Sequence, residues 1–227
     1  MTGRPLVIVG GGEHAVVVVE AARSRLGAWD VVGFSDRTRE SRLAAREPAI
    51  EDLGDDVALA ARLARDPDGA APALVLGIGG GTRPGDRAAA VNAFGPGTDW
   101  ATIIHATASV SPSARLGAGT VVGAGAIVQA GAVAGRHVIV NSGAILEHDV
   151  TLGDFTHVGP GAAIGGGTRI GAGVFVGLGA RVRDHITVGD GATIGMGAVV
   201  VADVAPGRTV VGVPARQAET GDDGADD

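Results

Sequence analysis

Residues 158–181 read VGPGAA-IGGGTR-IGAGVF-VGLGAR, four hexads that each begin with Val or Ile followed by Gly. The same period of six continues in both directions, from Ile104 to Ile194. Of the 16 residues on this step, 15 are Ile, Leu or Val, and Ala134 is the exception. A period of six matches neither the 3.6 residues of a helical turn nor the two of a plain alternating strand. We therefore expect a repeat architecture over residues 104–199.

The hexad pattern is typical of a coil of short parallel strands. One branched apolar side chain per hexad would point to the axis, and the fifth position holds only Ala, Thr, Val or Ile, from Ala108 to Ala198. Gly occupies the second position in 10 of the 16 hexads, where it permits a sharp turn. Three hexads make one coil, so about five coils stack as a solenoid. The repeat resembles the left-handed parallel β-helix of the hexapeptide-repeat acyltransferases, and the left hand is implied by that resemblance alone.

Residues 1–97 lack this period and alternate apolar runs with helical patterns. We expect strands at Leu6–Val9, Val31–Phe34 and Ala73–Ile78, and helices at Glu13–Ser24, Asp55–Arg65 and Asp86–Phe94. This order predicts a small, three-stranded α/β Rossmann-like domain over residues 1–97. Gly95-Pro96-Gly97 marks the boundary, and the β-helix domain covers residues 98–216. Residues 217–227 carry five acids and no apolar residue larger than Ala, which predicts a disordered acidic tail.

The first candidate site is Gly10-x-Gly12-x-x-Ala15, placed between a strand and a helix, with Asp36 at the end of the next strand. This spacing matches a dinucleotide-binding fingerprint, in which backbone N–H groups at a helix N-terminus face a diphosphate. The alternative is a tight turn that needs glycine and binds nothing. Three strands leave no room for a second nucleotide-binding half, so a nucleotide diphosphate attached to a group smaller than a second nucleotide fits best.

Composition excludes several kinds of chemistry. The chain has no Cys, which rules out disulfides, thiolate zinc sites and a cysteine nucleophile. All 18 basic residues are Arg, so no lysine Schiff base can form. The net charge of −7 argues against nucleic-acid partners and anionic membranes. No signal peptide or run of about 18 apolar residues is present, and we expect a cytoplasmic protein.

Three further segments carry a resemblance that covers about residues 5–216. They are Glu147-His148-Asp149, Phe155-Thr156-His157 and Gly212-Val213-Pro214-Ala215-Arg216. Together with the glycine-rich α/β domain and the solenoid, they resemble the bacterial sugar acetyltransferases of the sialic acid O-acetyltransferase-like group, which includes the UDP-4-amino-sugar N-acetyltransferases of bacillosamine synthesis. The resemblance implies acetyl-CoA as donor and co-substrate, a homotrimer, active sites between neighbouring subunits, and the His of the first segment as general base.

The period places two histidines without any resemblance. His148 is the third residue of its hexad, so its side chain should point outward near a corner. The flanking carboxylates of Glu147 and Asp149 favour the imidazolium and raise basicity, and the family resemblance implies that Asp149 has this role. A solvated surface histidine is the alternative. His157 follows nine residues later, half a coil on, and should face the opposite side of the prism. If both histidines serve one reaction, they must come from different chains.

The resemblance also implies two sets of binding residues. The acetyl-CoA set is His157, Gly166, Leu178, Gly195 and Met196, although the family more often has a small residue at the last position. The nucleotide-sugar set is Gly12, Glu13, His14, Asp36, Arg37 and Gly79. We expect His105, His137 and His185 on the solenoid surface. The six histidines include no His-x4-His pair, so we expect no metal.

These features predict an acetyl-CoA-dependent N-acetyltransferase acting on a nucleotide-linked 4-amino sugar, such as a UDP- or dTDP-4-amino-4,6-dideoxyhexose. A backbone N–H near Gly166 could stabilise the oxyanion. Two alternatives stay open: O-acetylation of a sugar such as a sialic acid, and a non-catalytic scaffold that senses nucleotides. Coenzyme A binding would separate the enzymes from the sensor.

Overall fold

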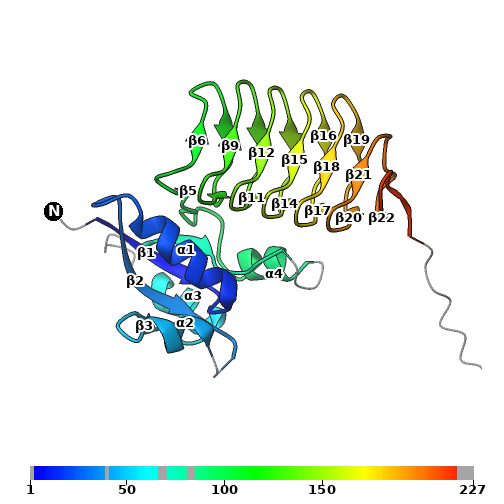
Figure 1. Ribbon diagram of the computed structural model, residues 1–227. Coiled ribbons are helices and arrows are strands. Elements are labelled where there is room, and N and C mark those ends of the chain that lie inside the picture. The colour runs from blue at the N-terminus through cyan, green and yellow to red at the C-terminus, as the bar shows by residue number, and fades with distance from the viewer. Residues whose placement is uncertain (1–2, 39–40, 66–70, 81–84, 219–227) are drawn as a thin grey trace, which may run out of the picture.

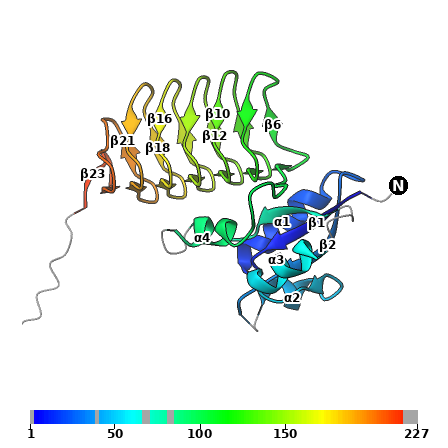
Figure 2. The same ribbon diagram turned by 180° about the vertical axis from the view of Figure 1, so that it is seen from behind.

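The structure is a computed structural model that describes residues 3–38, 41–65, 71–80 and 85–218. A long solenoid of parallel strands lies over a smaller α/β part, which sits beneath its N-terminal coils (Figures 1 and 2). Helix α4 extends from the α/β part along the underside of the solenoid toward its middle coils. None of the helices in the described part of the chain combines the length and the hydropathy that a membrane crossing requires.

The α/β part contains a four-stranded parallel sheet of order β3-β2-β1-β4. Its elements are β1 (Arg4–Val9), α1 (Glu13–Arg23), β2 (Trp29–Ser35), α2 (Arg42–Arg46), β3 (Glu51–Asp52), α3 (Asp56–Ala64), β4 (Ala73–Leu76) and α4 (Asp86–Asn92). The three predicted strands and three predicted helices are confirmed. The expected count of three strands was wrong, because the sheet has four. Strand β3 was missed, since it consists of two exposed acidic residues with no apolar pattern.

Side chains of β1 alternate between the two faces of this sheet, as a strand requires. Leu6 and Ile8 pack with α1 and α2 on one face, whereas Val7 and Val9 pack with α3 and α4 on the other. All four side chains are at most 1% exposed. The first face continues into the solenoid, since the same cluster includes Val121. The two parts therefore share a core.

The solenoid places strands of two residues, one per hexad, on three sheets. The eight-stranded sheet holds β5 (Ile103–Ile104), β8 (Val121–Val122), β11 (Ile139–Val140), β14 (His157–Val158), β17 (Phe175–Val176), β20 (Thr193–Ile194), β22 (Thr209–Val211) and β23 (Arg216–Gln217). The six-stranded sheet holds β6 (Ser109–Val110), β9 (Ile127–Val128), β12 (Ile145–Leu146), β15 (Ala163–Ile164), β18 (Arg181–Val182) and β21 (Val199–Val200). The five-stranded sheet holds β7 (Arg115–Leu116), β10 (Val133–Ala134), β13 (Thr151–Leu152), β16 (Arg169–Ile170) and β19 (Thr187–Val188).

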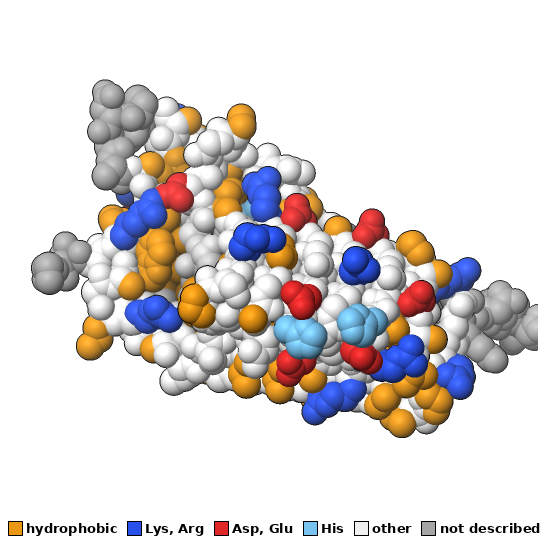
Figure 3. All heavy atoms as spheres, turned by 90° about the horizontal axis from the view of Figure 1, so that it is seen from above, with side chains coloured by type: hydrophobic (Ala, Val, Ile, Leu, Met, Phe, Trp, Pro, Cys, Tyr) orange, Lys and Arg blue, Asp and Glu red, His pale blue; other side chains and the backbone are white. Residues whose placement is uncertain are grey.

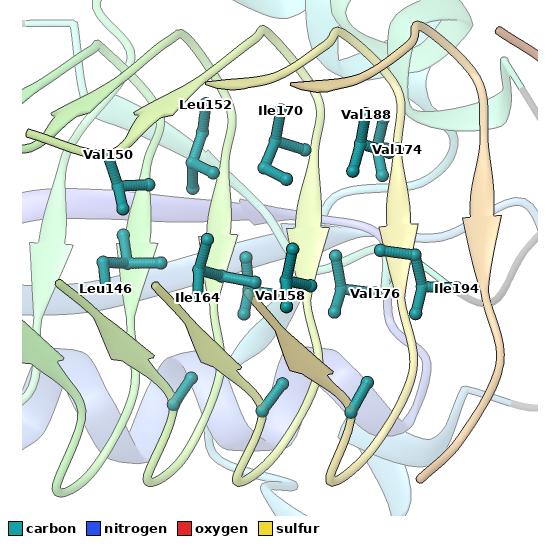
Figure 4. Close-up of a cluster of buried hydrophobic side chains, with 14 of the residues drawn as sticks. Leu146, Val150, Leu152, Val158, Ile164, Ile170, Val174, Val176, Val188 and Ile194 are labelled. Carbon is teal, nitrogen blue, oxygen red and sulfur yellow. The ribbon is translucent and has the colours of Figure 1, made fainter. Parts of the chain in front are cut away.

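Each coil is 18 residues long, so that His157 pairs in parallel with Phe175. The period-six side chains from Val122 to Ile194 are at most 4% exposed. They stack in rows inside the solenoid (Figure 4). The predicted parallel β-helix is thus confirmed, and its coils fit the left-handed type.

The last coil is covered on all three sheets by residues 204–217. Val204 bridges Val188 of β19, and the amide of Val199 in β21 donates to the carbonyl of Gly212. Strand β23 pairs antiparallel with β22, Gln217 lying opposite Val210. The predicted tail was therefore placed too early, because Gln217 belongs to a strand. The rest of that prediction falls on residues 219–227, outside the described residues.

Helix α4 joins the two parts through a buried arginine. The guanidinium of Arg87 donates to the backbone carbonyls of Phe155 (2.9 Å) and His137. The ring of His137 stacks on Phe155 at 5.1 Å and meets the edge of Trp100 at 4.8 Å. His137 is 0% exposed. The expectation that it lies on the solenoid surface was wrong, because the α/β part packs over this corner.

Candidate functional site

A cavity of about 560 Å³ lies at the carboxyl edge of the α/β sheet. We call it the edge pocket. It is lined by Gly10, Gly11, Gly12, Glu13, His14, Asp36, Arg37, Thr38, Asp56, Gly77, Ile78, Gly79 and Asp86. All six residues predicted for the nucleotide-sugar set line this cavity. Sequence reasoning missed four side chains in it: Thr38, Asp56, Ile78 and Asp86.

Glycines shape the floor of the edge pocket. Gly10 ends β1 with φ +98°, a conformation that L side chains rarely adopt. Gly12 is the N-cap of α1 and provides no side-chain cap, so the first amides of the helix are not capped from that position. Gly79 follows β4, and a Cβ there would lie in ordinary contact with the His14 side chain, 3.4 Å from its Cβ. The first turn of α1 thus faces a floor with little side-chain bulk, as an anion site at a helix N-terminus requires.

The edge pocket approaches the solenoid through His14, which lines the pocket and lies near His157. Their ring centroids are 6.4 Å apart, and Gly80 lies so close to the His157 ring that no Cβ would fit. His157 begins β14 on the eight-stranded sheet, is 8% exposed, and its Nε2 lies 3.2 Å from Nδ2 of Asn141. A second cavity of about 300 Å³ borders His157, Arg87 and Phe175.

Burial keeps these imidazoles neutral. Burial lowers the pKa of His157 to about 3, with smaller contributions from His14 and Arg87. Burial, and then the charge of Arg87, lowers the pKa of His14 to about 4. A neutral ring carries one N–H donor and one acceptor nitrogen, so both histidines can bind a substrate polar group at neutral pH.

We expect the melting temperature to fall as the pH is lowered from 6.5 to 5. Burial lowers the pKa values of His14 and His137 to about 4 and that of His157 to about 3, from 6.5. Below pH 6.5 the unfolded chain gains protons that the folded chain does not, so stability decreases. Asparagine tolerates the positive φ of position 137. The variant His137→Asn should therefore show a weaker dependence of the unfolding free energy on pH, by the equivalent of about one proton. Scanning calorimetry checks this; a flat profile in both proteins would contradict it.

His148 lies at the corner between the six-stranded and five-stranded sheets, between β12 and β13. Its side chain is 60% exposed, and its Nδ1 lies 3.0 Å from Oδ2 of Asp149. The outward orientation predicted from the hexad is confirmed. Figure 3 shows histidine side chains bordered by acidic side chains on the solenoid surface turned away from the α/β part.

Glycine at position 166 leaves room for the His148 ring. Gly166 lies one coil after His148, and a Cβ there would be 2.6 Å from His148 Nε2. Gly131, one coil before Asp149, is similarly required, because a Cβ would collide with Asp149 Oδ1. Glycines in the preceding and following coils therefore leave room for the side chains of His148 and Asp149 at this corner.

We expect Gly166→Ala to lower kcat by about tenfold or more while the protein stays folded, because the new methyl group must displace the His148 ring. Gly95→Ala is the matched control, since a Cβ there meets nothing within 4 Å and its φ is ordinary. Steady-state kinetics and a melting curve check the prediction. Unchanged turnover in Gly166→Ala would show that the ring position is irrelevant.

The other predicted acetyl-CoA residues lie at a different corner. Leu178 and Met196 are 55% and 78% exposed and occupy equivalent positions of successive coils, between the eight-stranded and six-stranded sheets. His157 lies on the strand leading into this corner, and Gly195 precedes Met196. One chain thus has two groups: His148, Asp149 and Gly166 at one corner, and His157, Leu178, Gly195 and Met196 beside another. Within the described residues, no three His, Asp or Glu side chains are grouped as a metal site requires.

Solved structures provide the comparison for this arrangement. The chain is similar to PerB from Caulobacter crescentus in complex with CoA and GDP-perosamine, with 34% identity, a TM-score of 0.80, and coverage of 94% of this chain and 97% of that one. A variant of the GDP-perosamine N-acetyltransferase from the same organism gives a TM-score of 0.79 at 34% identity, with coverage of 94% and 96%.

The acetyltransferase domain of PglB from Neisseria gonorrhoeae, in complex with acetyl coenzyme A, is 35% identical, with a TM-score of 0.81 and coverage of 95% of this chain and 100% of that one. No protein-family model matches the chain, and no curated protein matches it. Full-length similarity at this identity, together with the solenoid and the edge pocket, leads to one conclusion. The chain belongs to the hexapeptide-repeat sugar N-acetyltransferases.

Proposed function

We propose that the protein is an acetyl-CoA-dependent N-acetyltransferase that acylates the amine of a nucleotide-linked 4-amino sugar. The observation that carries this proposal is the contact between the edge pocket and the solenoid, since the ring of His14, which lines the pocket, lies 6.4 Å from the ring of His157. A nucleotide sugar with its diphosphate at α1 would extend its sugar toward the solenoid. The relatives support the same reading, since one binds CoA with GDP-perosamine and another binds acetyl coenzyme A.

The α/β part has the features of a Rossmann-like nucleotide domain. Its strand order, β3-β2-β1-β4, is that of the first four strands of a dinucleotide-binding sheet, with the glycine turn between β1 and α1. In such sheets ligands bind beyond the carboxyl ends of the strands, where the edge pocket lies. We assign residues 1–97 to nucleotide-sugar binding and residues 98–216 to acetyl transfer.

The chemistry proposed for the solenoid needs one base and one oxyanion donor. His148, oriented by Asp149 through Nδ1, takes a proton at Nε2 from the sugar amine as the nitrogen attacks the thioester carbonyl. The C–N bond forms, the C–S bond breaks, and coenzyme A leaves. The backbone N–H of Gly166 is the proposed donor to the oxyanion. A positioned base typically accelerates such a step about 10²–10⁴-fold.

The two separated groups of site residues support a homotrimer with shared active sites. His148 and His157 lie on opposite sides of one solenoid, so a single chain does not bring them together. Cyclic packing of three solenoids would place the His148 corner of one chain against the corner of its neighbour that carries Leu178 and Met196. The exposed apolar side chains at that corner would then become buried.

Acetyl-CoA and a panel of UDP-, dTDP- and GDP-linked 4-amino sugars test the proposal, with release of free thiol as the readout. We expect thiol release with at least one amino sugar and an amide in the product by mass spectrometry. Release with hydroxyl sugars alone would favour O-acetylation, and no release with coenzyme A failing to bind would favour a nucleotide sensor. Either result would overturn the proposal.

We expect Asp36→Ala to raise the Michaelis constant for the nucleotide sugar while leaving that for acetyl-CoA nearly unchanged. Asp36 lines the edge pocket, and the donor is expected along the solenoid. Loss of uniform binding raises KM more than it lowers kcat. Asp30→Ala, exposed near the other end of β2, is the control. Equal damage to both Michaelis constants would mean that the assignment of the two parts is wrong.

A further inference from the structure

The order of the strands determines the order in which residues follow one another along the edge pocket. Moving along the sheet edge, the residues after β4 (Gly77 and Gly79) come first, those after β1 (Gly10 to Gly12) second, and Asp36 and Arg37, after β2, third. Strand β4 is next to the solenoid, since its Leu74 bridges Trp100. With the diphosphate at the middle position and the sugar toward the solenoid, the nucleoside must lie at the β2 end.

A buried carboxylate holds the arginine at that end. Asp56, in the first turn of α3, has a side chain that is 4% exposed. Its Oδ2 accepts from Nε of Arg37 at 2.9 Å and lies 2.8 Å from Nη2, and its Oδ1 accepts from the Ser35 hydroxyl at 2.8 Å. The Arg37 side chain nevertheless stays 58% exposed. Its Nε side is therefore held, and its outer edge, with one N–H each from Nη1 and Nη2, is not used by Asp56.

We infer that Arg37, positioned by Asp56, binds the nucleobase and selects guanine. This inference rests on the proposed function. Two parallel N–H donors match two adjacent acceptors, and the N7 and O6 atoms of guanine form such a pair. Adenine pairs the N7 acceptor with an N6 donor, and uracil and thymine present a single acceptor, O4, on that edge. We therefore expect a guanine nucleotide in the edge pocket, in place of the UDP or dTDP named in the sequence analysis.

Isothermal titration of the whole protein with GDP, UDP, dTDP, ADP and CDP tests this assignment. We expect GDP to bind at least about tenfold more tightly than UDP or dTDP. Arg37→Lys keeps the charge but removes the fork, so GDP affinity should fall about tenfold while UDP affinity changes little. Arg62→Lys is the matched control, because Arg62 lies on α3 like Asp56, pairs with Glu51 of β3 and lies outside the edge pocket. It should change neither affinity.

Asp56→Asn separates positioning from a structural role. If Asp56 positions Arg37, the ratio of GDP to UDP affinity should fall; equal weakening of every diphosphate would mean that Asp56 only stabilises the fold. Equal affinity for all five diphosphates, or tighter binding of UDP, dTDP, ADP or CDP, would overturn the choice of guanine. That result would leave the acetyltransferase proposal intact, which fails only when no nucleotide-linked amino sugar is acetylated.

Discussion

Replacing His148 with Asn is expected to lower kcat at least about 100-fold, while both substrates still bind. Asparagine keeps the approximate size and one hydrogen bond but cannot accept the amine proton. The ring is exposed, so the substitution should leave the melting temperature unchanged. Steady-state kinetics with both substrates varied, together with a melting curve, checks the prediction. Asp149→Asn should reduce kcat less, by about tenfold, because Asp149 only orients the base through its contact with Nδ1.

His185→Asn is the control for His148→Asn. The side chain of His185 is also exposed, and its Nε2 lies 3.9 Å from Oδ2 of the neighbouring Asp184. It resembles His148 in its exposure and in having a carboxylate beside it, but it has no part in the proposed chemistry. Turnover of His185→Asn should therefore be unchanged. If His148→Asn kept most of its turnover at neutral pH, His148 would not be the base and the site would have to be sought around His157.

Mixing two impaired variants is expected to restore activity. His157→Asn should raise the Michaelis constant for acetyl-CoA, and His148→Asn should lower kcat. If each site takes His148 from one chain and His157 from its neighbour, random trimers of the two variants contain about a quarter of their sites with both native histidines. Co-expression with two affinity tags and tandem purification would isolate these mixed trimers. Each mixed trimer has one site of three with both native histidines, so its kcat/KM for acetyl-CoA should approach about a third of the wild-type value.

No recovery in the isolated mixed trimers would show that each site is built within one chain. A double variant, His148→Asn with His157→Asn, mixed with wild-type chains is the control for this experiment. It cannot contribute a native histidine to any site, so activity should only decrease as its share rises. Light scattering must also show a trimer, since a fully active monomer would exclude shared sites.

The solenoid and the placement of its histidines could be predicted because period six leaves each position a single environment. The rule that the third hexad residue points outward placed His148 correctly, and the half-coil offset placed His157 on the opposite side. The fingerprint likewise identified Gly10 and Gly12 of the edge pocket, because a turn from strand to helix around an anion has few sequence solutions.

Contacts between the two parts could not be predicted, because no local pattern records them. His137 follows the hexad rule for a corner, yet Trp100 and Arg87 cover it from outside the repeat. Asp56 was missed for a similar reason: an acid in the first turn of a helix is ordinary there. Its role depends on Ser35 and Arg37, which reach it from the neighbouring strand and loop.

The covering of the last coil determines in which direction the protein can assemble. An open stack of parallel strands ends in unpaired N–H and C=O groups, which invite a second molecule to continue the stack. Here Val204, Gly212 and β23 occupy that end on the three sheets. Growth along the solenoid axis into filaments is thereby blocked at the C-terminal end. The sides of the solenoid, where His148 and Leu178 are exposed, stay available for contacts between copies.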